Sequence, residues 1–332
     1  MHFQYVKDEE SDSREDVVAK ILFDARCFAS AARNYVSTGL SLLDDTAHEN
    51  TLACELISSN GAPVNQGHTE DFYWAETGDY LLVAYWANEA TAGGLRQATE
   101  SIYNRLLIEI QTRAFPFLVR AWNYFADING IDENDGLERY RQFCIGRFDA
   151  FAAQGIAENQ FPSACALGHH GGDLLIYALA SKTAAQHFEN PQQASAYHYP
   201  AEYGPRSPSF ARASLLEPAG QMAKLFVSGT ASVVGFVTRH PDDLNLQIQV
   251  TLENLDCLLA HIGAEYASTH DGIKPTLEAE VIKIYVRNPD DITIIKDRIS
   301  KAYPAAPAIY LAADICRSDL LLEVDGIWNL VE

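Results

Sequence analysis

Gly172-Asp173-Leu174-Leu175 is repeated near the end of the 332-residue chain as Ser318-Asp319-Leu320-Leu321, at an offset of 319 − 173 = 146 residues. Each segment leads into an apolar run, which is typical of a buried strand. Because the same kind of segment closes both halves of the chain, the pattern indicates an internal duplication. In this register Tyr177 of the first half corresponds to Glu323 of the second.

Strand and helix patterns alternate through the second half. Short apolar runs predict strands, and Leu or Ile at three- and four-residue spacing predicts helices. Asn288-Pro289 is a typical helix start, because proline is tolerated in the first turn. We expect strands at 222–227, 280–286, 308–315 and 319–324, and helices at 249–260 and after Asn288-Pro289, the latter carrying Ile292, Ile295 and Ile299.

The first half runs in the same order, with strands expected at 80–85, 117–122, 163–167 and 173–179, and helices at 97–110 and 136–152. This order predicts an α/β fold of two units with similar topology. A generic α/β protein that alternates by chance is the alternative. We place the N-terminal unit at 1–186 and the C-terminal unit at 187–332, with the polar segment 187–199 as linker.

The chain is strongly acidic, with a net charge of −21, and 48% of its residues are hydrophobic. Such a surface repels nucleic acid and anionic lipid, so neither is expected as a partner. No apolar run approaches the ~20 residues that span a membrane. Residues 1–16 are polar and acidic, unlike a signal peptide, so we expect a cytoplasmic protein whose six scattered cysteines are reduced. An anionic small substrate would require arginines that converge locally.

The segment 203–212 combines a tyrosine, two arginines and two prolines ahead of a predicted strand. Proline fixes φ, so we expect a stiff loop. Arginines on such a loop suit a carboxylate, which they grip with two parallel hydrogen bonds. Tyr203, Arg206 and Arg212 are therefore candidate substrate residues, and a rigid surface loop with solvated arginines is the alternative.

Arg147 lies inside the apolar stripe of the predicted helix 136–152, between Cys144 and Phe151. An arginine that faces a core needs an anion, which is either an internal carboxylate or a ligand. Arg120 alternates with apolar neighbours and could face either way.

Glu323 is flanked by apolar residues in a predicted strand. If it faces a pocket, desolvation raises its pKa and favours the protonated form that a general acid needs. A solvated edge strand is the alternative. Nothing local activates Cys316 as a nucleophile, and a core cysteine is the simpler interpretation. The histidines lack metal-site spacing, and no phosphate-binding glycine loop or G-x-S-x-G motif is present, so we expect no metal and no cofactor.

Several short segments, in their order, resemble the chorismatase family, also called pteridine-dependent deoxygenase-like, over most of the chain after about residue 75. They are RAWNY (120–124), IN (128–129), ERY (138–140), GR (146–147), SAYHYP (195–200), the block 203–213, SGTAS (228–232) and ADICR (313–317). The second half alone is also similar to the small trimeric enamine deaminases of the RidA/YjgF type. Because chorismatases use that chorismate-mutase-like fold twice, the resemblance implies two tandem RidA/YjgF-like α+β units, with mixed sheets that are packed with helices on one face.

The resemblance also implies a reaction, the cleavage of chorismate to a hydroxybenzoate and pyruvate without a cofactor. Glu323 would protonate the enolpyruvyl methylene, a task for a carboxylic acid that burial keeps neutral. Arginines would hold the two substrate carboxylates, and by position we expect Arg147, Arg206 and Arg212, with Tyr203 nearby.

The product is expected from two further residues. The aromatising branches of the family resemble this chain in pairing a glycine, here Gly229, with a cysteine seven residues before the acid, here Cys316 (323 − 316 = 7). A glycine leaves room where a methyl group would redirect the ring, and a cysteine can assist loss of the ring hydroxyl. We therefore expect 3-hydroxybenzoate, alone or with 4-hydroxybenzoate.

Two features depart from the family pattern. Phe236 stands where we expect histidine after Val-Val-Gly, and the residues before about 75 match poorly and supply no site residues. The alternatives are hydrolysis of chorismate to a dihydroxycyclohexadiene carboxylate, an enamine or imine deaminase, and a non-catalytic binder of aromatic acids. The oligomeric state is open between a monomer and a small homo-oligomer.

Overall fold

The computed structural model describes residues 1–7, 15–24, 29–30, 35–43, 53–132 and 135–331; Cys27 lies outside these ranges. It contains two seven-stranded sheets, the first sheet and the second sheet. From edge to edge, the first sheet consists of β7 (Asn65–His68), β8 (Phe72–Thr77), β9 (Tyr80–Ala87), β12 (Leu174–Ser181), β10 (Phe117–Ala126), β11 (Ser163–His169) and β20 (Asp314–Ile315). The second sheet consists of β13 (Gln186–Phe188), β14 (Ala213–Leu216), β15 (Lys224–Thr230), β21 (Leu322–Val331), β18 (Thr276–Val286), β19 (Ala308–Ala312) and β5 (Ser41–Leu42).

The two sheets have the same strand order and the same pairing directions. The fifth and sixth strands are parallel in each, β10 with β11 and β18 with β19. The other neighbouring pairs are antiparallel. Tyr177 and Glu323 both lie on the fourth strand, in β12 and β21. The duplication predicted from the sequence is therefore confirmed at the level of topology.

The edge strands are exchanged between the halves of the chain. β20 follows β19 in the sequence but pairs with β11 of the first sheet, and β5 from the N-terminal region pairs with β19 of the second. The boundary at 186/187 stays a prediction, and β13 already begins at Gln186.

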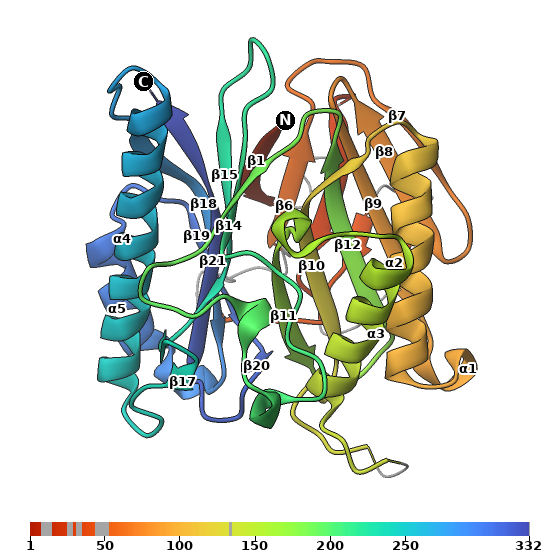
Figure 1. The fold of residues 1–332 in the computed structure, drawn as a ribbon, viewed down its shortest axis with the longest axis vertical. Helices are drawn as coiled ribbons and strands as arrows, with labels where there is room; N and C mark the ends of the chain where they lie inside the picture. The colour runs from red at the N-terminus through yellow and green to blue at the C-terminus, as the bar shows by residue number, and fades with distance from the viewer. Residues whose placement is uncertain (8–14, 25–28, 31–34, 44–52, 133–134, 332) are drawn as a thin grey trace.

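Helices cover the outer face of each sheet, so the molecule has four layers, helix, sheet, sheet, helix (Figure 1). α2 (Leu95–Thr112) and α3 (Arg139–Ala153) pack on the first sheet, and α4 (Leu244–Thr269) and α5 (Ile292–Ala302) pack on the second. The helices form because their apolar residues recur at helical spacing, as with Ile295 and Ile299 in α5. The inner faces of the two sheets meet in a common core.

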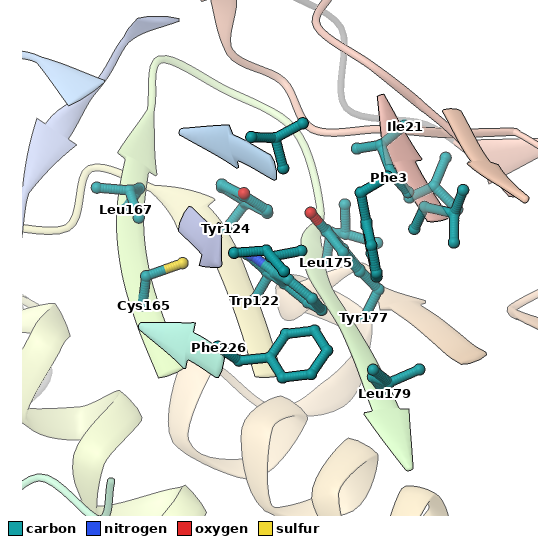
Figure 2. Packing of buried hydrophobic residues seen from close by; sticks show 14 of the residues in the cluster. Phe3, Ile21, Trp122, Tyr124, Cys165, Leu167, Leu175, Tyr177, Leu179 and Phe226 are labelled. Carbon is teal, nitrogen blue, oxygen red and sulfur yellow. The ribbon is translucent and has the colours of Figure 1, made fainter. Parts of the chain in front are cut away.

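Aromatic side chains fill that central core (Figure 2). Trp122 of β10 stacks on Tyr177 of β12, with ring centroids 4.7 Å apart, and Phe226 reaches in from the second sheet. A five-stranded N-terminal sheet adds Phe3 and Ile21 to the same cluster. Its strands, in order, are β1 (His2–Lys7), β6 (Ala53–Ser58), β2 (Val17–Leu22), β4 (Tyr35–Ser37) and β3 (Ala29–Ser30).

Each helix and strand expected between residues 80 and 324 has a counterpart in the structure, but some bounds differ, one expected strand is two strands, and the N-terminal sheet was not predicted. The helix expected at 249–260 is the longer α4. The strand expected at 319–324 begins only at Leu322, because the backbone turns where Leu320 N–H donates to the Arg317 carbonyl (3.1 Å), and it continues to Val331. The expected strand 308–315 is divided between β19 and β20, which join different sheets.

The remaining elements are short. They are α1 (Glu89–Ala92), the β16–β17 hairpin (Val233–Val234 and Val237–Thr238), and the 3-10 turns η3 (Glu158–Gln160), η4 (Ala196–His198), η5 (Ala201–Tyr203) and η6 (Pro289–Asp291). Within the described ranges, no helix has the length and apolar character to cross a membrane.

Candidate active site

A cavity of about 380 Å³ is lined by residues from both halves of the chain. The first half contributes the N-terminal part of α3 and a stretch of β11. The second half contributes the loop ahead of β14, the end of β15, the hairpin region 231–238, the turn 316–320 and one residue of β21. The volume falls within the roughly 300–1,000 Å³ that is usual for small-molecule sites.

Glu323 projects from β21 into this cavity. Its neighbours Leu322 and Val324 pack toward the helices, so strand alternation turns Glu323 toward the inner face. The side chain is 4% exposed. Burial, and then the negative charge of Asp325, raise the pKa of Glu323 to about 8, against the opposing charges of Arg120 and Arg212. The carboxyl is therefore protonated at neutral pH.

Gly229 of β15 lies directly against this carboxyl. A Cβ atom on residue 229 would stand 1.8 Å from Glu323 Oε1 and 2.5 Å from its Cδ. Any other residue would push the carboxyl out of its present position. Glycine at 229 is thus a condition for the acid's placement.

Cys316 lines the cavity on the turn that precedes β21. Burial, and then the charge of Glu323, raise its pKa to about 12. The group is a thiol at neutral pH and not the thiolate that a nucleophile needs. Cys165 of β11 is a second cysteine in the lining, and burial raises its pKa as well.

Arg147 reaches the cavity from α3, on the same helical stripe as Tyr140 and Cys144. Gly146 allows α3 to approach α2 closely, because a Cβ there would meet the Arg96 carbonyl at 2.4 Å. Arg147 is 2% exposed, and its guanidinium lies over the Phe143 ring. In the part of the chain that the structure describes, Arg147 forms no ion pair, and its Nε has no hydrogen-bond partner.

Arg212 enters the cavity from the loop ahead of β14 and is also buried. Its Nη2 donates to the Ala194 carbonyl at 3.0 Å and to the Tyr199 hydroxyl at 2.8 Å. Its Nε has no partner among the described residues. Two hydrogen bonds thus fix the guanidinium and leave one edge of it unused.

Tyr203 lines the cavity, but Arg206 does not. The guanidinium of Arg206 lies over the Phe148 ring, 4.4 Å from its centroid, on an exposed side chain. The structure therefore brings together Glu323, Cys316, Arg147, Tyr203, Arg212 and Gly229 from the candidates and leaves Arg206 outside.

Known proteins share this architecture. The model of the family "Chorismatase FkbO/Hyg5-like, N-terminal" matches residues 56–180. A 3-hydroxybenzoate synthase from Streptomyces hygroscopicus is 36% identical over 80% of this chain and 78% of its own. A chorismatase from Streptomyces rapamycinicus is 36% identical over 87% of this chain and 89% of its own. The chain belongs to the chorismatase family.

A crystal structure of a chorismatase shows the same fold at full length. It is 29% identical and covers 98% of both chains with a TM-score of 0.85. The expected two-unit α/β fold is confirmed by this match and by the duplicated strand order. A member of the YjgF/YER057c/UK114 family from Mycobacterium tuberculosis matches 36% of this chain at 18% identity and a TM-score of 0.26.

The cavity of this chorismatase family member also contains cationic residues that the sequence reasoning missed. Arg317 lies over the Tyr203 and Tyr199 rings, 4.5 and 5.3 Å from their centroids. Arg141 follows Tyr140 in α3 and donates from Nε to Glu138 at 3.1 Å. Both arginines lie in or beside the segments on which the resemblance rested, so the signal was present but was not used.

Phe236, which replaces the expected histidine, does not line the cavity with its ring. The ring contacts Tyr203, and the backbone carbonyl accepts a hydrogen bond from Arg317 Nη1 at 2.9 Å. Residue 236 therefore bears on the cavity through its contacts with Tyr203 and Arg317, which line it. Among the described residues, no three His, Cys, Asp or Glu side chains gather as metal ligands.

Proposed function

We propose that this protein converts chorismate to 3-hydroxybenzoate and pyruvate. The observation that carries the proposal is a protonated, buried carboxyl, Glu323, in one cavity with Arg147, a buried cation without a carboxylate partner among the described residues. A buried charge of this kind needs an anion, and a substrate carboxylate supplies it. The names of the curated relatives support the same reaction.

The first step is proton transfer from Glu323 to the terminal methylene of the enolpyruvyl ether. A neutral carboxylic acid can make this transfer because its pKa of about 8 keeps the proton available at neutral pH. The resulting oxocarbenium ion is stabilised by the carboxylate that remains on Glu323. Hydroxybenzoic acid and pyruvic acid together contain the atoms of chorismic acid, so the overall conversion needs no oxidant and no net water.

The arginines have two tasks in this scheme. Arg147 and Arg212 are buried and fixed, so they are suited to hold the substrate carboxylates in one orientation. Arg141 and Arg317 are only partly buried and concentrate positive charge at the cavity of a protein with net charge −21. This local field draws a dianionic substrate toward an otherwise repelling surface.

Chorismate is the one partner that we propose. The protein would work in the cytoplasm, where the free thiols that the structure describes stay reduced. Nucleic acid and anionic membranes are repelled by the net charge.

The direct test is to incubate the purified protein with chorismate, measure pyruvate and separate the ring products by chromatography. We expect one pyruvate for each 3-hydroxybenzoate. If 4-hydroxybenzoate also forms, the amount of pyruvate should equal the sum of the two hydroxybenzoates. Absence of pyruvate would remove the proposal. Pyruvate with a non-aromatic diol would keep the family's substrate and reject the proposed product.

Cys316→Ala is expected to change the ring product more than the rate of chorismate consumption. Its thiol stays protonated and can donate a hydrogen bond to the departing ring hydroxyl, whereas the acid step does not use it. The ratio of aromatic to non-aromatic products and the pyruvate rate are measured on the same samples. If the ratio is the same as in the parent protein, Cys316 serves packing alone.

Gly229→Ala is expected to lower kcat about tenfold or more and to alter the product ratio. The added methyl group would overlap Glu323 Oε1, so the carboxyl must rotate away from its present position, and misplacement of a reacting group is costly. Steady-state kinetics and product chromatography measure both effects. Gly171→Ala is the matched control, because a Cβ there meets no atom within 4 Å, and parental kinetics are expected.

A further inference from the structure

Two carboxylates stand two residues apart on the inner face of β21. Glu323 and Asp325 both face the first sheet, because Leu322 and Val324 pack on the helix side. Asp325 is 1% exposed, so neither group is screened by water. Two negative charges this close in a buried place repel each other, and one group then stays neutral or is paired.

Asp325 is the paired one. Arg120 of β10 crosses from the first sheet, with Nη2 2.6 Å from Asp325 Oδ2, and both side chains are almost fully buried. The Tyr285 hydroxyl of β18 donates to the same oxygen at 3.1 Å. A buried arginine so close to a carboxylate compensates its charge. The sequence left open which way Arg120 faces, and the structure shows that it faces the core between the two sheets.

We propose that Asp325, fixed by Arg120 across the two sheets, is a positioning residue whose charge keeps Glu323 in its protonated form before each reaction. The inference rests on the proposed function, in which Glu323 is the acid. Once the proton has left, Glu323 is itself an anion beside Asp325. Their repulsion then favours return of a proton and prepares the next cycle.

The groups that face Glu323 from the surrounding elements agree with this assignment. Its pKa is raised by burial first and by Asp325 second, and lowered by Arg120 and Arg212. Cys165 on β11 and Cys316 on the preceding turn are neutral thiols, because burial raises the pKa of each. Asp325 is thus the neighbouring anion whose charge favours the protonated acid.

The duplication supports a functional reason for the pair. At the offset of 146 residues, the positions of Glu323 and Asp325 correspond to Tyr177 and Leu179 in the first half. Tyr177 and Leu179 lie in the central apolar cluster, and neither is a carboxylate (Figure 2). Glu323 and Asp325 therefore occur together only on β21, the fourth strand of the second sheet, which lines the cavity. Arg120, which pairs with Asp325, comes from the first sheet.

The test is the pH dependence of kcat/KM for chorismate in Asp325→Asn. In the parent protein, activity should fall above about pH 8, where Glu323 loses its proton. Asparagine keeps the shape but removes the negative charge and leaves Arg120 unopposed. We expect the alkaline limb to move at least about one pH unit toward acid, which is about a fivefold loss at pH 8 and about a tenfold loss at pH 9, with most activity retained near pH 6.

Other outcomes overturn the proposal. An equal loss at every pH would give Asp325 a merely structural role, and an unmoved limb would show that its charge does not act on Glu323. If the parent protein releases no pyruvate from chorismate at any pH, the proposed function itself is wrong. The two failures are therefore distinguishable.

Glu55→Gln is the matched control. Glu55 is a fully buried carboxylate in the same core, paired with Lys283 Nζ at 2.8 Å, and it does not contribute to the shifted pKa of Glu323. Its loss should lower stability and leave the alkaline limb in place. A shift as large as that of Asp325→Asn would assign the effect to general disturbance of the core and reject the specific role.

A measurement on the parent protein covers the case in which Asp325→Asn does not fold. Carbon-13 NMR of labelled carboxyl groups follows protonation directly, and the Glu323 resonance is the one absent from Glu323→Gln. We expect the Glu323 carboxyl to titrate near pH 8. A Glu323 carboxyl that is already ionised at about pH 6 would contradict the proposal.

Discussion

Glu323→Gln is expected to abolish pyruvate release from chorismate and to leave the protein folded. The amide has the size of the carboxyl and can occupy the same place against Gly229, but it cannot donate a proton to the enolpyruvyl methylene. Removal of a catalytic acid costs on the order of 10²–10⁴ in rate. Single-turnover pyruvate assays give the residual rate.

The same variant should be at least as stable as the parent protein at alkaline pH. The pKa of Glu323 is about 8 in the folded protein and 4.5 as a reference value, so the folded state binds more protons than the unfolded state between these values. Stability attributable to this group therefore falls as the pH rises from about 4.5 to 8, by an amount on the order of a few kcal/mol. Glutamine has no such penalty, and urea unfolding at pH 6 and 9 measures the difference.

Glu138→Gln provides the comparison for Glu323→Gln. Glu138 also lines the cavity, but it is partly exposed and pairs with Arg141, so its loss should change the rate by less than about tenfold. If Glu323→Gln retained a rate near that of Glu138→Gln, another group would supply the proton. Loss of stability in Glu323→Gln above pH 8 would contradict the raised pKa.

The duplicated fold could be predicted because its signals, a repeated segment and an alternation of strand and helix patterns, can be read from short stretches of sequence. Tyr177 and Glu323 fell in register, and the structure places both on the fourth strand facing inward. The stripe that contains Cys144 likewise placed Arg147 toward the interior. Patterns with a period of two or of 3.6 residues report the buried face, and an ionisable residue on that face is a candidate for function.

Contacts between distant segments could not be predicted in this way. The exchange of β20 and β5 depends on which sheet edge is free, and no periodicity encodes it. Arg206 was chosen because a proline-rich loop presents arginines, but the loop directs Arg212 inward and Arg206 outward onto Phe148. The partner of Arg120 lies 205 residues away. Pairings of this length require the folded chain.

Arg147→Met is expected to reduce kcat/KM for chorismate more than about 100-fold without a loss of stability. Truncation of a buried cation that binds a carboxylate costs about 2–5 kcal/mol of binding. Arg147 has no ion pair within the described ranges, and its guanidinium instead lies over the Phe143 ring and hydrogen-bonds the Tyr103 hydroxyl, so methionine leaves no carboxylate unpaired. Replacing such a charge by an apolar side chain of similar length is neutral or stabilising. Steady-state kinetics and urea unfolding measure the two effects.

Arg120→Met, in contrast to Arg147→Met, should lower the free energy of unfolding. Arg120 is as deeply buried as Arg147, but it is paired with Asp325 at 2.6 Å, so its loss leaves an uncompensated carboxylate and costs about 3–5 kcal/mol of stability. Arg206→Ala, on the exposed side of the same loop region, should leave both stability and kcat/KM nearly unchanged. If Arg147→Met were destabilised and kept a normal kcat/KM, Arg147 would stabilise the fold and would not bind the substrate. A residue that only binds the substrate carboxylate is not needed for stability.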